Sequence, residues 1–129
     1  MIVYFIAIPL IMHGLANLAG VFAPWTKNMQ GFKNSTLVFS SGVLLNSTAG
    51  KLFSLIWLAS SICLIFAGAG VLMHQTGWRW ASVLGCVFSL VAILPWWKAV
   101  PPGARFGAVP FDILVIGLLS SPLGTWPVW

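Results

Sequence analysis

The fold is decided by residues 52–73, which read LFSLIWLASSICLIFAGAGVLM and contain no charged side chain. A helix needs about 20 consecutive apolar residues to cross the roughly 30 Å hydrocarbon core of a bilayer. This stretch is long enough, so the sequence predicts that it crosses a membrane as a helix.

The rest of the chain has the same character. Of its 129 residues 60% are hydrophobic and only 5% are charged, and the mean hydropathy is +1.01. A water-soluble fold would have too little polar surface at this composition. Three further apolar stretches lie at 2–23, 80–97 and 109–123. We therefore expect a single all-α domain over residues 1–129, a polytopic membrane protein built as a left-handed bundle of four transmembrane helices.

Two prolines and the tryptophans support this division. Pro24 is expected to end the first helix, and Pro110 stands where we expect the first turn of the last helix, a position that tolerates proline. Tryptophan favours the headgroup level of a bilayer. With four crossings one surface carries Trp25, Trp96 and Trp97, and the other carries Trp78, Trp80, Trp126 and Trp129. A cleaved secretory signal is the alternative for the first stretch, but no basic residue precedes it and it is longer than the apolar part of such signals.

The basic residues predict the orientation. Connectors 24–51 and 98–108 contain five of the six, namely Lys27, Lys33, Lys51, Lys98 and Arg105. Basic connectors stay preferentially in the cytoplasm. We therefore expect a multi-pass protein of the cell membrane with these connectors inside and both termini outside. The lipid bilayer is its first partner, and the scattered charges do not form a nucleic-acid-binding stripe.

The connector from Trp25 to Lys51 is expected to be structured. Residues 36–39 and 43–45 favour strands around Ser40-Ser41-Gly42, which reads as the turn of a small β-hairpin. An interfacial helix or a re-entrant loop are the alternatives. A hairpin edge can pair with a partner chain. The docking candidates are Leu37, Val38, Phe39, Val43, Leu44 and Leu45.

Ionisable residues within membrane helices are costly, and His13 and Asp112 both lie within predicted spans. Asn17 follows His13 by one helical turn on the same face. Counted from one membrane surface the three lie at about 8 to 15 Å depth, so they can form one polar cluster if the first and last helices are neighbours. A ligand-binding or proton-responsive site is one interpretation. In the other, the cluster is structural, with Asp112 stabilised by a helix N-terminus and His13 bound to a carbonyl.

Other chemistry is not indicated. His13 and Asp112 lack a third donor for a metal, and no serine stands in a hydrolase motif. Cys63 and Cys86 lie within apolar stretches and are read as small apolar side chains. The sequence therefore predicts no metal site and no catalytic residue, and it identifies no cofactor.

Residues 13–20, HGLANLAG, resemble the first-helix pattern HGLxHLxGF of small prokaryotic membrane proteins that are loosely DoxX-like. Leu55-Ile56-Trp57-Leu58-Ala59, Ser89 and Ala104-Arg105-Phe106-Gly107 extend the resemblance over most of the chain. It implies a four-helix bundle with a structured first connector. Asn17 stands where the pattern has a second histidine, and Gly103 stands where an acid commonly precedes Ala-Arg.

Three functions remain open. The small chain with few reactive groups favours a non-enzymatic accessory or assembly subunit of a larger membrane complex or of a homo-oligomer. The alternative is a binder or carrier of a lipophilic, quinone-like molecule that uses His13, Asn17 and Asp112. The DoxX-like resemblance alone implies a third function, a subunit of a membrane oxidoreductase.

Overall fold

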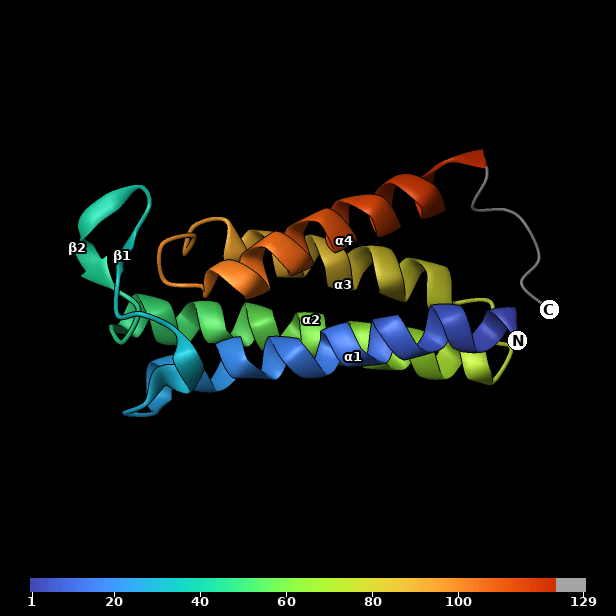
Figure 1. Cartoon of the computed structure of the whole chain (residues 1–129), viewed down its shortest axis with the longest axis horizontal. Coiled ribbons are helices and arrows are strands. Elements are labelled where there is room, and N and C mark those ends of the chain that lie inside the picture. Colours follow the sequence, from blue (N-terminus) through green and yellow to red (C-terminus); the bar gives the residue numbers. More distant parts are fainter. Residues whose placement is uncertain (123–129) are drawn as a thin grey trace.

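Four helices dominate the computed structural model, which describes residues 1–122 (Figure 1). They are α1 (Ile2–Phe22), α2 (Thr48–Leu72), α3 (Trp78–Ile93) and α4 (Pro102–Ser120). Two short 3₁₀ turns, Ala23–Trp25 and Met29–Gly31, follow α1, and the strands β1 (Thr36–Leu37) and β2 (Ser40–Leu44) pair as an antiparallel hairpin. The predicted four-helix architecture with a small hairpin in the first connector is confirmed. Residue 123, the predicted end of the last span, and Trp126 and Trp129 lie outside the described residues.

Three of the helical segments are long and apolar enough to cross a bilayer, namely Ile2–Trp25, Thr48–Leu72 and Pro102–Ser120. Helix α3 has 16 residues and rises only about 24 Å. It ends at Ile93, four residues before the expected 97, and the chain continues in turns. The reason is Pro95, which has no N–H to continue the helical ladder.

The helices form an antiparallel bundle in which α1 packs on α2, α2 on α3 and α3 on α4. Glycines permit the closest approaches. A Cβ on Gly20 of α1 would lie 2.5 Å from the Trp57 ring of α2, and a Cβ on Gly85 of α3 would lie 2.6 Å from the Leu64 side chain. Helix α4 covers α3 and diverges from α1 toward its C-terminal end (Figure 1). Helices α1 and α4 are therefore less closely packed on each other than the consecutive helices are.

Helix α4 begins seven residues earlier than the hydropathy suggested, at Pro102, which occupies the first turn. Pro110 consequently lies inside the helix, so its expected place in the first turn is wrong. A proline at the N-terminus of a helix costs no backbone hydrogen bond, and Pro102 fulfils that role here. The early start moves Asp112 to the middle of α4.

The hairpin lies at the same end of the bundle as the α3–α4 connector and is held against it. The amide of Val38 donates to the carbonyl of Pro95 at 2.8 Å, and the amide of Lys33 donates to the carbonyl of Ala99 at 2.8 Å. The turn is formed by Val38 and Phe39 rather than by Ser40-Ser41-Gly42, because the register pairs Leu37 with Ser40 and Thr36 with Leu44. The expected turn residues thus belong to β2.

Candidate functional site

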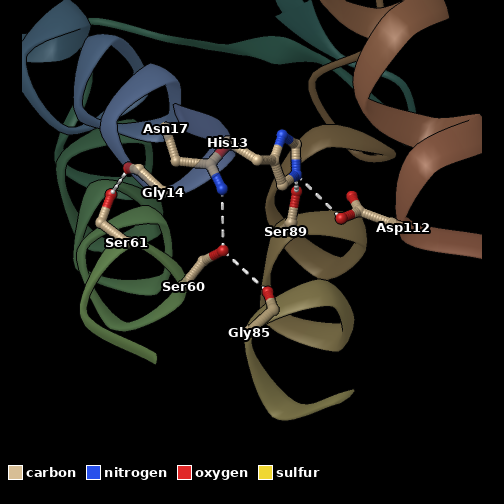
Figure 2. A network of polar contacts seen from close by, with 8 residues as sticks. All are labelled: His13, Gly14, Asn17, Ser60, Ser61, Gly85, Ser89 and Asp112. Atoms are coloured by element: carbon tan, nitrogen blue, oxygen red, sulfur yellow. Dashed lines mark hydrogen bonds and ion pairs between the residues drawn. The ribbon is translucent and has the colours of Figure 1, made fainter. Parts of the chain in front are cut away.

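Helices α1 and α4 are connected at mid-height by one strong polar contact, between His13 and Asp112. Nε2 of His13 lies 2.8 Å from Oδ1 of Asp112 (Figure 2). The His13 side chain is 11% exposed and that of Asp112 is fully buried. A proton on Nε2 is donated to the carboxylate, which makes the contact charge-assisted when Asp112 is ionised. The predicted proximity of these two residues is therefore observed.

The surroundings of Asp112 differ from those expected of a helix N-terminus. Asp112 lies about 15 Å along the axis from the start of α4, and the field of a helix terminus acts within the first turn only. The interpretation that free N–H groups and the macrodipole stabilise this carboxylate is wrong. His13 is also not bound to a carbonyl, since its Nε2 contacts the carboxylate itself.

Asn17 belongs to a different part of the polar network. Its Nδ2 donates to Oγ of Ser60 at 2.8 Å, and the Ser60 hydroxyl donates to the carbonyl of Gly85 at 2.7 Å. This chain of bonds connects α1, α2 and α3 (Figure 2). The single cluster expected of His13, Asn17 and Asp112 is therefore divided, because Asn17 faces α2 while His13 faces α4.

Two side chains of α3 complete the surroundings of the pair. Oγ of Ser89 lies 3.4 Å from Nε2 of His13, and Cys86 lies close enough to Asp112 to interact with its carboxylate. Neither residue was a site candidate. Because they are three residues apart, both side chains lie on one face of α3. This spacing can be read from the sequence, but the sequence does not show that this face contacts His13 and Asp112.

The pair has hydrogen-bonding capacity that the described part of the chain leaves unused. Oδ2 of Asp112 is buried without a hydrogen-bond partner. The second ring nitrogen of His13 points away from Asp112 and has no partner within residues 1–122 (Figure 2). Buried polar atoms normally have partners, so Oδ2 of Asp112 marks a place where a further donor fits.

Two cavities lie between α1 and α4, one on each side of the pair. The first, here called the polar cavity, has a volume of about 330 Å³ and includes His13, Asn17, Gln30, Trp57 and Gly107 in its lining. The second, here called the apolar groove, has a volume of about 240 Å³ and is lined by Phe5, Leu10, Phe111, Leu118 and their neighbours. The Phe111 ring, 4.9 Å from the His13 ring between centroids, marks the boundary. The lining of the first space includes polar side chains, and that of the second is made of large apolar side chains.

The six docking candidates of the hairpin do not share one surface. Val38, Phe39 and Leu44 are exposed, with Phe39 at 82%, whereas Leu45 is fully buried. Leu37 and Val43 are half-buried against the cluster of Leu45, Trp57 and Trp96. Leu45 is therefore a core residue and is not available to a partner.

Within residues 1–122 no group of three His, Cys, Asp or Glu side chains is placed to hold a metal ion. Comparisons of the chain with protein families, with curated proteins and with solved structures found no match. A paired imidazole and carboxylate beside a cavity can hold a polar group by hydrogen bonds and can exchange a proton with it.

Proposed function

We propose that the protein is a four-span integral membrane protein that binds a lipophilic small molecule with a polar head, such as a quinone, in the polar cavity. The observation that carries this proposal is the contact between His13 and Asp112 at the edge of that cavity. Buried ionisable pairs inside membrane proteins usually mark a functional site because they are costly to maintain.

The placement in a membrane is supported by the surface of the bundle. Large apolar side chains are exposed on several helices, among them Phe5 at 77%, Phe66 at 69% and Trp80 at 75%. Lipid is the solvent that makes such a surface favourable. The first and third connectors lie at one end of the bundle (Figure 1). Five of the six basic residues lie in these connectors or in the first turns of the helices that follow them, which supports the orientation with that end in the cytoplasm.

The pair is better suited to binding than to holding the bundle together. A buried ion pair contributes little net stability compared with apolar residues of similar volume, so packing alone does not require it. The pair also retains a free imidazole nitrogen, which accepts from a hydroxyl when the ring is neutral and donates to a carbonyl when it is protonated. A quinone and its quinol present these two groups.

Trp57 provides the experimental signal, because it lines the polar cavity and a bound quinone quenches indole fluorescence. We expect a decyl-substituted benzoquinone to quench the fluorescence of the protein saturably in lipid nanodiscs, with the saturable part absent from Trp57→Phe. Replacing both members of the pair, in His13→Leu/Asp112→Leu, should weaken binding by about tenfold or more, which corresponds to at least ~1.4 kcal/mol.

The double replacement is chosen because it leaves no unpaired buried charge. Ile113→Leu, on the exposed side of α4, is the matched control and should bind like the native protein. If the double variant binds the quinone with native affinity, His13 and Asp112 have no role in binding. If the quenching of the native protein does not saturate, the polar cavity is not a quinone site.

A non-enzymatic accessory subunit is the second candidate, and the exposed tip of the hairpin favours it. Phe39 is 82% exposed and Val38 is 45% exposed, while the strands below them are fixed to the α3–α4 connector. Such a presented aromatic side chain fits an interface with another membrane subunit or a second copy. The same double variant separates the two functions: an accessory subunit should retain its co-purifying partners when His13 and Asp112 are replaced and lose them in Phe39→Ser.

A further inference from the structure

We infer that the ligand is a neutral amphiphile with a hydrocarbon chain, whose head occupies the polar cavity while its chain lies in the apolar groove. This inference rests on the proposed function and specifies the chemical class of the ligand. The observation behind this inference is that the two cavities follow one another along α1 and α4.

The cavities follow one another along the same pair of helices. The polar cavity is lined by α1 from His13 to Gly20 and by α4 from Gly103 to Ala108. The apolar groove continues along α1 from Leu10 back to Phe5 and along α4 from Phe111 to Leu119. Because α1 and α4 are antiparallel, these ranges form two consecutive sections of the interface between the helices.

The contact between His13 and Asp112, together with the Phe111 ring that lies 4.9 Å from the His13 ring between centroids, marks the place where these two sections meet. Asp112 is fully buried and the His13 side chain is 11% exposed, so both lie beneath the surface where the two sections meet. A flexible chain can pass over them. Helix α4 also diverges from α1 toward its C-terminal end (Figure 1), and the groove lies in this diverging part.

The lining defines the charge of the head. Apart from the imidazole of His13, no ionisable side chain lines the polar cavity, and Asn17 and Gln30 are its other polar side chains. A phosphate would find no lysine or arginine there and would lie near the Asp112 carboxylate, so a phospholipid head is unfavourable. A neutral head with carbonyl or hydroxyl groups matches the imidazole and amide groups.

The groove itself is entirely apolar in its side chains. The residues from α4 are Phe111, Leu114, Val115, Leu118 and Leu119. A chain gains little from leaving lipid for such a groove, because lipid is equally apolar. The groove therefore selects a chain by its shape. Its role is measured by filling the groove with a larger side chain, because the chain itself adds little affinity.

The test compares a benzoquinone without a side chain with its decyl derivative, both tritiated, by scintillation proximity to the protein in nanodiscs. Leu118→Trp and Leu114→Trp each fill the groove from positions that are about half exposed, and Ile113→Trp on the same helix, outside the groove, is the matched control. Overpacking at this scale corresponds to about a tenfold loss or more. We expect that loss for the decyl derivative in both groove variants, unchanged binding of the chainless compound, and native binding in Ile113→Trp.

The outcomes separate this inference from the function on which it rests. If both compounds bind the native protein and the groove variants bind the decyl derivative normally, the chain does not occupy the groove and the inference is wrong while the head site stands. If the groove variants lose the chainless compound as well, the groove is not a separate chain site. If neither compound binds the native protein saturably, the proposed function fails, and this inference fails with it.

Discussion

Among the described residues Asp112 forms its ion pair with His13, so the two side chains should act on stability as a unit. Replacing His13 by leucine leaves a carboxylate buried without its partner, and we expect this to lower the free energy of unfolding by about 3 to 5 kcal/mol. His13→Leu/Asp112→Leu should be close to the native protein, because the desolvation cost disappears together with the attraction. Reversible denaturation in mixed detergent micelles measures both. A double variant as unstable as His13→Leu would show that the pair is not coupled.

The sequence was informative about which residues form this contact and much less about their surroundings. His13 and Asp112 were identified because ionisable groups within apolar stretches require a partner. Asn17 shares the general face of His13, yet one helical turn rotates a side chain by about 40°, which is enough to direct it to Ser60 on α2 rather than to α4. Ser89 and Cys86 could not be assigned because their role depends on how α3 rotates against α4.

At the scale of elements, the hairpin is fixed to the start of α2 by a close backbone contact. A Cβ on Gly50 would lie 1.7 Å from the carbonyl oxygen of Leu45, whereas one on Gly42 in β2 would meet nothing within 4 Å. Leu45 is fully buried, so the carbonyl cannot move aside without disturbing the core. The contact therefore requires glycine at position 50.

We expect Gly50→Ala to lower the free energy of unfolding by about 1 to 3 kcal/mol through overpacking. Gly42→Ala, in the same hairpin region, should change it by no more than about 0.5 kcal/mol. Parallel denaturation curves in detergent compare the two variants. Equal stability of both would mean that the first connector is not packed on α2 as described.

The existence of the helices and of the hairpin followed from the sequence, but their ends did not. Hydropathy placed the start of the last helix at Val109, since Arg105 and two prolines precede it, whereas the helix begins at Pro102. There the Arg105 guanidinium bonds the Trp97 carbonyl and lies 4.9 Å from the Trp97 ring. The hairpin turn was misplaced for a related reason, since the amide of Val38 is bonded to Pro95, in a connector that no local pattern relates to it.

At the scale of the whole molecule, the proposed function requires a bundle that is surrounded by lipid and that crosses the membrane four times. Four crossings place both basic connectors on one side, with the α2–α3 connector opposite. They also place the pair of His13 and Asp112 near mid-depth, where ionisable side chains are costly. Helix α3, with 16 residues, is the shortest of the four and is shorter than the three candidate spans.

The most direct measurement is the accessibility of single cysteines to a membrane-impermeant maleimide in intact cells, in a background with Cys63 and Cys86 replaced by alanine. Gln75→Cys should react in intact cells, while Lys33→Cys and Lys98→Cys should react only after the membrane is opened. Labelling of positions 33 and 98 from opposite sides would contradict four crossings, as would a protein that remains in solution without detergent.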